Sequence, residues 1–324
     1  HEKETNMFNW NDYGNGVYGF DSGYVRPELA AIYLMVENGR AAFVDSGSND
    51  SVPNALAALK KVGLDETAVD YVILTHIHLD HAGGASLMMQ KFPNAKLVVH
   101  PRGARHMIEP SKLIAGVSAV YGADYVKKVY GEILPIPAER IIEAPDDTRI
   151  SLNGRELLCI DTPGHARHHM CIVDQKSQGI FTGDMFGLSY RELDIDDRVF
   201  IFPTTTPTQF EPEEMRKSIA RLLEFKPKAM YLTHYGAVYH PEKLARELLR
   251  HITAVVNMAE YVQSLGLDHD TRHQRLKDAL QAYIIMQAQM FGSTLSSEQI
   301  AEIFAGDIEL NTQGMTVWLD SLAK

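Results

Sequence analysis

The feature that most restricts the fold of this chain is the segment 75–84, which reads THIHLDHAGG. It places three histidines and one aspartate within six positions, directly after an apolar run at 69–74 that is rich in β-branched residues. Apolar runs of this kind are typical of buried strands. The chain must therefore form a sheet in which the end of one buried strand presents imidazole and carboxylate groups together.

These side chains have the spacing of metal ligands. Residues two positions apart on an extended backbone point to the same side, so His76 and His78 can reach one metal ion together. Where the chain turns away from the strand, Asp80 and His81 can reach a second point nearby. Each imidazole supplies a neutral nitrogen, and the carboxylate offsets part of the metal charge. The segment predicts a site for a pair of metal ions.

Three later strands are predicted to end in the same way. The apolar runs at 157–160, 179–181 and 229–232 are each followed by small or hydroxyl residues and then by His or Asp. The candidate ligands after these runs are His165, Asp184 and His234. The carboxyl ends of strands are where sites assemble in α/β folds, because the chain turns there and presents side chains to one crevice. We therefore expect all three to join the first cluster.

The pattern of elements changes along the chain. Residues 1–240 alternate short apolar strands with helical stretches, which predicts a mixed α/β body with a helical insertion at about 101–137. Residues 241–324 have helical periodicity, which predicts an all-helical C-terminal extension. We hypothesise that the insertion and the extension form a cap that selects an acyl or other apolar group. A homodimer interface is the alternative role for the extension.

The pattern His-x-His-x-Asp-His-x-Gly, followed by isolated His, Asp and His, resembles the metallo-β-lactamase superfamily, in its dinuclear-hydrolase branch with glyoxalase II and the lactonases. The resemblance covers residues 31–236 and implies an αββα sandwich, with two mixed sheets packed face to face and helices outside. It also implies a ligand set: His76, His78 and His165 for one metal, Asp80, His81 and His234 for the other, and Asp184 as the bridge between them.

This resemblance implies two divalent metal ions as cofactors, of which we expect zinc, with iron or manganese as alternatives. A water that bridges two such ions loses its proton near neutral pH, because even one zinc lowers its pKa to about 7. The resulting hydroxide would attack a carbonyl or phosphoryl group, with no serine or cysteine nucleophile. Asp80 and Asp184 are the candidate catalytic carboxylates, and Asp80 would also steer the proton toward the leaving group.

Four further residues are weaker candidates. Asp45 matches a superfamily acidic position that supports the site, although a solvated turn residue is the alternative. His169 is a candidate to orient a ligand or else a structural histidine, whereas its neighbour His168 is expected to be exposed. Tyr190 and Tyr235 lie in loops next to the candidate ligands, where they would contact substrate or simply pack.

The choice among branches favours a small carbonyl substrate. True β-lactamases of the superfamily generally lack the bridging aspartate, and lactonases tend to place a tyrosine where this chain has Gly187. We expect hydrolysis of an ester, thioester or lactone. A diiron protein of the same fold that reacts with oxygen or nitric oxide is the alternative, ahead of an RNA or phosphodiester hydrolase and of a binding protein with a vestigial site.

Composition limits the partners and the compartment. Acidic residues outnumber basic ones by 42 to 31, for a net charge of −11, which disfavours a nucleic-acid partner. Two cysteines, Cys159 and Cys171, lie in apolar strands and are expected in the core, so a reducing compartment is the default. No apolar run approaches the roughly 18 residues of a membrane span, and residues 1–6 lack a signal pattern. We expect a cytoplasmic protein with no membrane partner.

Overall fold

The computed structural model describes residues 8–324. Residues 1–6, for which we expect no signal peptide, lie outside the described residues. The chain divides into two compact units. The first contains the residues up to 161 together with 168–183 and 226–239, and the second contains 162–167, 184–225 and 240–324. The division predicted from the sequence, with its boundary at residue 240, stays a prediction.

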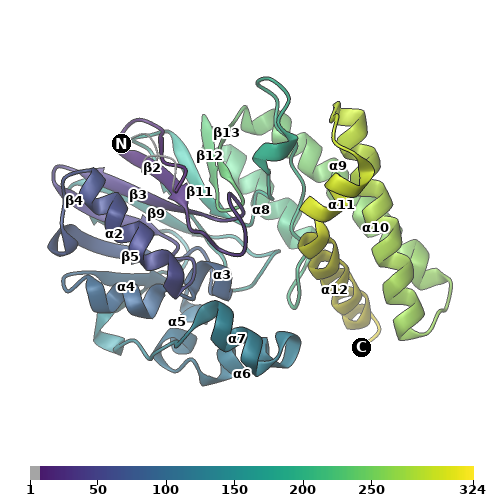
Figure 1. Ribbon diagram of the computed structural model, residues 1–324, viewed down its shortest axis with the longest axis horizontal. Helices are drawn as coiled ribbons and strands as arrows, with labels where there is room; N and C mark the ends of the chain where they lie inside the picture. Colours follow the sequence, from purple (N-terminus) through teal and green to yellow (C-terminus); the bar gives the residue numbers. More distant parts are fainter. Residues whose placement is uncertain (1–7) are drawn as a thin grey trace. The chain divides into compact units, whose positions relative to one another are not determined.

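The first unit contains two mixed β-sheets (Figure 1). In the first sheet the strands follow one another in chain order: β1 (Asn11–Asp12), β2 (Val17–Asp21), β3 (Ala31–Glu37), β4 (Arg40–Val44), β5 (Val69–Ile73), β6 (Lys96–Val99) and β7 (Ile141–Glu143). Strands β1 to β4 pair antiparallel, and β4 to β7 pair parallel. Strands β3 and β4 form a hairpin with Asn38 and Gly39 at its turn, both with positive φ.

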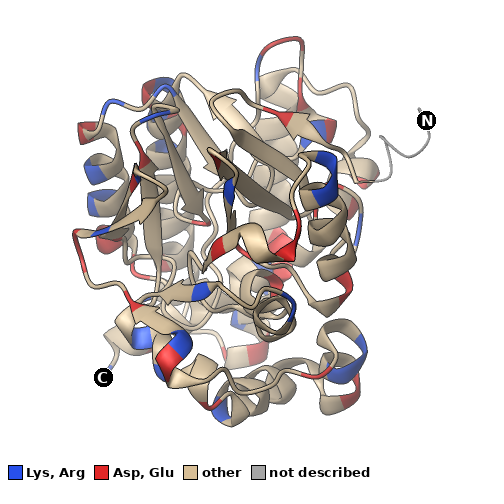
Figure 2. Ribbon diagram, turned by 90° about the vertical axis from the view of Figure 1, so that its left-hand side faces the viewer, with Lys and Arg blue, Asp and Glu red and all other residues tan. Residues whose placement is uncertain are grey.

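The second sheet has the spatial order β13-β12-β11-β10-β9-β8. Its strands are β8 (Thr148–Leu152), β9 (Arg155–Asp161), β10 (Met170–Asp174), β11 (Gly179–Gly183), β12 (Ala229–Leu232) and β13 (Gly236–Tyr239). Only the β11–β12 pair is parallel. Figure 2 shows that charged residues are sparse along the strands and frequent on the helices and loops, as expected for sheets covered on their faces.

One hydrophobic core lies between the two sheets. It contains Tyr33 and Val44 from the first sheet together with Cys159, Ile172 and Phe181 from the second. Burial raises the pKa of the Cys159 thiol to about 12, and Cys171 is also fully buried, so the prediction that both cysteines belong to the core is confirmed. Neither thiol is placed to act as a nucleophile.

The alternate side chains of the first sheet form a second core with helices. Ile32, Leu34 and Phe43 pack with residues of three helices: α2 (Val52–Lys61), α4 (Ala85–Lys91) and α5 (Pro101–Ile108). This two-residue alternation between a sheet-facing side and a helix-facing side gives the unit its layers. The shorter helical segments of the unit are η1 (Asn49–Ser51), η2 (Glu66–Ala68), α3 (Leu79–Ala82) and η3 (Ala138–Arg140).

The helical insertion predicted at 101–137 consists of α5, α6 (Ser111–Tyr121) and α7 (Ala123–Tyr130). Helix α6 is apolar but contributes no fully buried residue. Its partly buried Leu113 and Val117 pack on a small cluster centred on Leu79, Val126 and Tyr130. The insertion therefore leaves apolar surface exposed beside the short helix α3.

The second unit is mainly helical. Its elements are η4 (Arg191–Leu193), α8 (Pro212–Glu224), α9 (Pro241–Ser264), α10 (His269–Phe291), α11 (Ser297–Ile303) and α12 (Ala305–Leu322). Local signals set the helix starts: the Asp268 side chain accepts a hydrogen bond from Thr271 N, and Ser296 forms a capping box with Gln299. Among the described residues, no helix is both long and apolar enough to cross a bilayer.

Candidate metal centre

The motif residues lie where the sequence predicts, after a strand end. Strand β5 stops at Ile73, and the extended backbone of His78 leads into α3, which carries Asp80 and His81. The rings of His76 and His81 are only 4.0 Å apart between centroids, and His76 and His78 are 4.7 Å apart. His76 and His81 are fully buried. Four candidate ligands therefore lie within the six residues 76–81 that follow β5.

Asp80 lies between two imidazoles. Its Oδ2 atom is 3.2 Å from His81 Nε2 and 3.3 Å from Nε2 of His234, which follows β12. Burial acts to raise the pKa of Asp80, but the charge and hydrogen bonds of these two histidines outweigh it, and the pKa lies below the ordinary aspartate value. Asp80 is thus an anion at neutral pH, as a metal-binding carboxylate must be.

A buried carboxylate at the end of β4 organises this region. Asp45 is 1% exposed, and its carboxylate accepts hydrogen bonds from Thr75 N, Thr75 Oγ and Thr233 Oγ. It also lies 2.8 Å from His81 Nδ1. Thr75 and Thr233 each directly precede a candidate ligand, so Asp45 ties the ends of β5 and β12 together. Asp45 is therefore no solvated turn residue, which was the alternative weighed from the sequence.

Every candidate imidazole that has a hydrogen bond at Nδ1 directs Nε2 toward the other ligands. In His76 the Nδ1 atom lies 3.0 Å from Thr75 Oγ, and in His234 it lies 2.7 Å from the Leu29 carbonyl. A hydrogen bond at one ring nitrogen fixes the tautomer and leaves the other nitrogen to bind metal. This arrangement is typical of histidines in metal sites.

The second unit supplies two further candidates, His165 and Asp184. The Nε2 atom of His165 is 3.2 Å from Asp184 Oδ2, and both residues are buried. On the other side of the ring, Nδ1 lies 3.1 Å from Thr204 Oγ and 3.3 Å from Thr206 Oγ. The Thr204 hydroxyl donates to the carbonyl oxygen of Asp184 at 2.9 Å. Here, too, a hydrogen bond at Nδ1 turns Nε2 toward a carboxylate.

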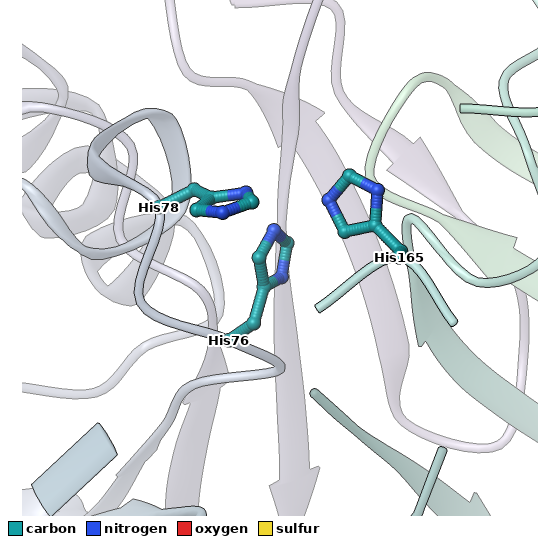
Figure 3. A group of neighbouring side chains, drawn as sticks. All are labelled: His76, His78 and His165. Atoms are coloured by element: carbon teal, nitrogen blue, oxygen red, sulfur yellow. The ribbon is translucent and has the colours of Figure 1, made fainter. Parts of the chain in front are cut away.

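All seven side chains predicted as ligands fall into two groups, within each of which the candidate ligand atoms lie no more than 4.8 Å apart. The groups are His76, His78 and His165, whose rings are drawn in Figure 3, and Asp80, His81, Asp184 and His234. Three imidazoles, and two imidazoles with two carboxylates, are donor sets that suit zinc, iron or manganese. The residues present therefore fit a pair of divalent metals.

Two histidines next to the cluster complete its surroundings. His169 is fully buried, and its ring stacks on that of His76 at 4.8 Å. His168, expected to be exposed, is instead half-buried: its Nδ1 accepts a hydrogen bond from Ile77 N, and its ring lies 5.1 Å from that of His78. The reason is that Met170, the first residue of β10, donates a backbone hydrogen bond to the Thr75 carbonyl at 2.7 Å, which holds the preceding histidines beside the motif.

The two tyrosines singled out from the sequence are packed inside the fold. Tyr190 is 1% exposed, its hydroxyl donates to Asp307, and its ring packs on Phe304. Tyr235 is 3% exposed and belongs to the core between the sheets. These contacts match the packing role that was weighed as the alternative to substrate contact.

A tyrosine pair that sequence reasoning missed lies beside the motif. The hydroxyls of Tyr24 and Tyr130 are 2.7 Å apart and their rings are stacked. Burial and then the charge of Asp80 raise the pKa of both phenols well above the ordinary tyrosine value. No local pattern could have indicated this pair, because its members are 106 positions apart and neither belongs to a recognisable motif.

Comparison with known proteins gives the family and the fold of this chain. A family model described as the metallo-beta-lactamase superfamily matches residues 25–234. A metallo-beta-lactamase fold-containing protein of Sulfurisphaera tokodaii is 29% identical over 228 residues, which cover 69% of this chain and 79% of the relative. The crystal structure of an archaeal superfamily protein from Sulfolobus tokodaii has a TM-score of 0.65 and 25% identity, and covers 93% of this chain and 98% of that chain. The predicted αββα fold with C-terminal helices is confirmed.

Relatives with a named activity match shorter stretches. An N-acyl homoserine lactonase of Bacillus thuringiensis is 28% identical over 188 residues, 58% of this chain and 63% of the relative. An atrochrysone carboxyl ACP thioesterase of Aspergillus fumigatus is 26% identical over 172 residues, 52% of this chain and 43% of the relative. This chain thus spans less than two thirds of either. The peroxy diiron form of the chemotaxis sensor ODP shares the fold, with a TM-score of 0.53 and 15% identity over 74% of this chain and 93% of that chain.

Proposed function

Because this chain belongs to the metallo-β-lactamase superfamily, we propose that it is a dinuclear metal-dependent hydrolase of a small ester, thioester or lactone. The observation that carries the proposal is the grouping of seven side chains into two adjoining donor sets. Four of the imidazoles have a hydrogen bond at Nδ1, which leaves Nε2 for a metal. The superfamily contains relatives named as a lactonase and a thioesterase, and both reactions open a carbonyl compound.

The residues define what each group would hold. His76, His78 and His165 would bind one divalent cation, and Asp80, His81 and His234 would bind the second. Asp184 groups with the second set, yet its carboxylate also approaches His165, so it is the residue best placed to bridge. When bound, two zinc ions would lower the pKa of a water nucleophile and polarise the substrate carbonyl.

The chain's own residues then orient the reactants. In the second group Asp80 has the most exposed side chain, at 24%, whereas its partner His81 is fully buried. As an anion with an accessible oxygen, Asp80 can accept a hydrogen bond from the attacking water and hold its proton on the side of the leaving group. Buried Asp45 keeps His81 in place while this proton moves.

The neighbouring helices favour an apolar acyl group. Leu79 lies between two candidate ligands, and it packs on Val126 and Tyr130 of α7. Beyond them, α6 offers Val120, which is 52% exposed, and Tyr121, which is 41% exposed. Leu79 itself is buried, but the exposed apolar side chains of α6, a helix that packs on its cluster, are suited to the hydrocarbon part of an acyl substrate.

A substrate panel tests the proposal. The protein loaded with zinc or with manganese is offered thioesters, lactones, esters and phosphodiesters, and His76→Ala serves as the matched inactive variant. We expect carbonyl substrates with apolar acyl chains to be cleaved only by the unmodified chain. Equal rates for the two proteins across the panel would refute the proposal. Stoichiometric iron with a visible absorption band would instead favour the diiron alternative.

A further inference from the structure

We infer that Asn311, on the C-terminal helix α12, is a positioning residue for the metal centre. It fixes the loop 203–206, whose Thr204 holds both His165 and Asp184. This inference rests on the metal-binding role proposed above for these two ligands. It gives the helical extension a part in the site that differs from a cap or a dimer interface.

The first step of the argument is the geometry at Thr204. Its hydroxyl donates to the Asp184 carbonyl oxygen at 2.9 Å, and a hydroxyl has only one proton to donate. The ring nitrogen Nδ1 lies 3.1 Å from this hydroxyl oxygen and 3.3 Å from the Thr204 carbonyl oxygen, which can only accept, so Nδ1 is the donor. His165 is thereby held as the tautomer with its lone pair on Nε2, the nitrogen that faces Asp184 Oδ2. Thr204 thus fixes one ligand's tautomer and another ligand's backbone.

The second step is what holds Thr204. The Asn311 side chain donates from Nδ2 to the Pro203 carbonyl and accepts at Oδ1 from Thr205 N, each at 3.1 Å. The Asn311 carbonyl accepts a third bond from Thr205 Oγ, also at 3.1 Å. Asn311 is 1% exposed, so water does not compete for these bonds. The amide therefore forms hydrogen bonds with the backbone of both residues that flank Thr204.

A second contact between the same helix and the same loop supports this assignment. Gly314, one turn after Asn311, lies against Thr205, and a Cβ atom at Gly314 would overlap the Thr205 carbonyl oxygen. The absence of a side chain lets α12 approach the loop closely enough for the amide of Asn311 to reach it. Two positions on one face of α12 are thus specialised for the loop that carries Thr204.

The matched control is the next residue along the helix. Thr312 is fully buried on α12, and its hydroxyl donates within the helix to the Ile308 carbonyl. Replacing Thr312 by valine removes this hydrogen bond within the helix and leaves the hydrogen bonds from Asn311 to the loop in place. Asn311→Leu and Thr312→Val should both destabilise the helix, but only Asn311→Leu should change the metal centre.

The experiment measures zinc affinity by chelator competition, the visible spectrum of the cobalt-substituted protein, and urea unfolding of the metal-free protein. We expect Asn311→Leu to lower the affinity of one of the two sites about tenfold and to alter the cobalt spectrum. Thr312→Val should keep the wild-type affinity and spectrum. Wild-type affinity and spectrum in Asn311→Leu would overturn the inference.

A milder variant keeps the test decisive if Asn311→Leu does not fold. Asn311→Asp retains the acceptor for Thr205 N but loses the donor to Pro203 O, and it should lower zinc affinity by a smaller factor. Wild-type affinity in folded Asn311→Asp would count against the inference in the same way. If the wild-type chain binds no cation, the proposed metal centre itself is overturned. If the wild type and the Asn311 variants bind two ions with equal affinity, only the inference about Asn311 is overturned.

Discussion

The candidate ligands of the two units are supported in different ways. In the first unit the buried carboxylate of Asp45 receives hydrogen bonds from one candidate ligand and from the residues that precede two others. In the second unit the support is neutral: a threonine hydroxyl holds His165 and Asp184, and an asparagine amide holds the threonine's loop. In this protein one buried carboxylate supports the candidate ligands of the first unit, whereas a series of neutral contacts supports those of the second.

This difference has an energetic consequence. Hydrogen bonds to an ionised group are roughly twice as strong as those between neutral groups. The ligands of the first unit should therefore tolerate less change at their support than those of the second. Three substitutions, in order of decreasing expected effect, test how far this contrast holds, and a pH dependence in the second unit follows as the smallest effect.

The largest effect should come from removing a ligand itself. We expect His76→Ala to lose the metal of its group and to lower kcat/KM by more than about a hundredfold, beyond the range of changes at supporting residues. The matched control is His269→Ala, because His269 is an exposed histidine with a 68% accessible side chain. Metal analysis and kinetics on both variants test this expectation. A His76→Ala protein with full metal content would show that His76 is no ligand, and the comparison of ligand supports would then lose its basis.

Next in size is Asp45→Asn. Asp45 has φ of 65°, which asparagine also adopts readily, so the backbone should be retained. The new amide group must face a donor, and we expect zinc affinity to fall about 10- to 100-fold and the free energy of unfolding to fall by about 1–3 kcal/mol. Asp196→Asn, at an exposed aspartate with φ of 54°, is the control and should change neither quantity.

Thr204→Val should have a smaller effect than Asp45→Asn. It removes a neutral hydroxyl, so we expect a decrease in zinc affinity of about tenfold. Thr316→Val removes another buried threonine hydroxyl, one that donates within α12 to Thr312 O, and should leave affinity unchanged. If Thr204→Val cost as much affinity as Asp45→Asn, the proposed contrast between charged and neutral support would be wrong.

The smallest effect is a pH dependence of stability in the helices of the second unit. His251 on α9 is 1% exposed, and burial lowers its pKa from the ordinary value of 6.5 to about 4. The unfolded chain takes up the proton first as pH falls, so stability is full above pH 6.5 and decreases toward pH 4. Between about pH 6 and pH 5 the metal-free protein should lose about 1 kcal/mol.

Replacing this histidine isolates its contribution. His251→Gln keeps a polar group beside the Tyr283 hydroxyl, which lies 2.8 Å from His251 Nδ1, but it does not titrate. Urea unfolding at both pH values should show a smaller pH step in this variant than in the wild type. An unchanged step would assign the pH dependence to other groups.

The sequence indicates the candidate ligands better than it indicates the residues that support them. His76, Asp184 and His234 each follow an apolar strand, so an apolar run that ends in a polar residue is enough to find them. Thr204 and Asn311 lack such a pattern: they lie in a loop and a helix face, and Thr205 and Asn311 are 106 positions apart. Contacts of that kind depend on how helices pack, which side-chain periodicity does not specify.

The sequence separation between Asn311 and the loop 203–206 determines the order in which they are synthesised. At about 5–20 residues per second, the ribosome delivers Asn311 some 5–20 s after Thr205, since 106 positions lie between them. In the later part of that interval, once His234 has been added, the nascent chain has all the imidazoles and carboxylates of the cluster but lacks the amide that holds the loop beside His165 and Asp184. Tight metal capture should therefore lag behind the folding of the sheets and coincide with the docking of α12.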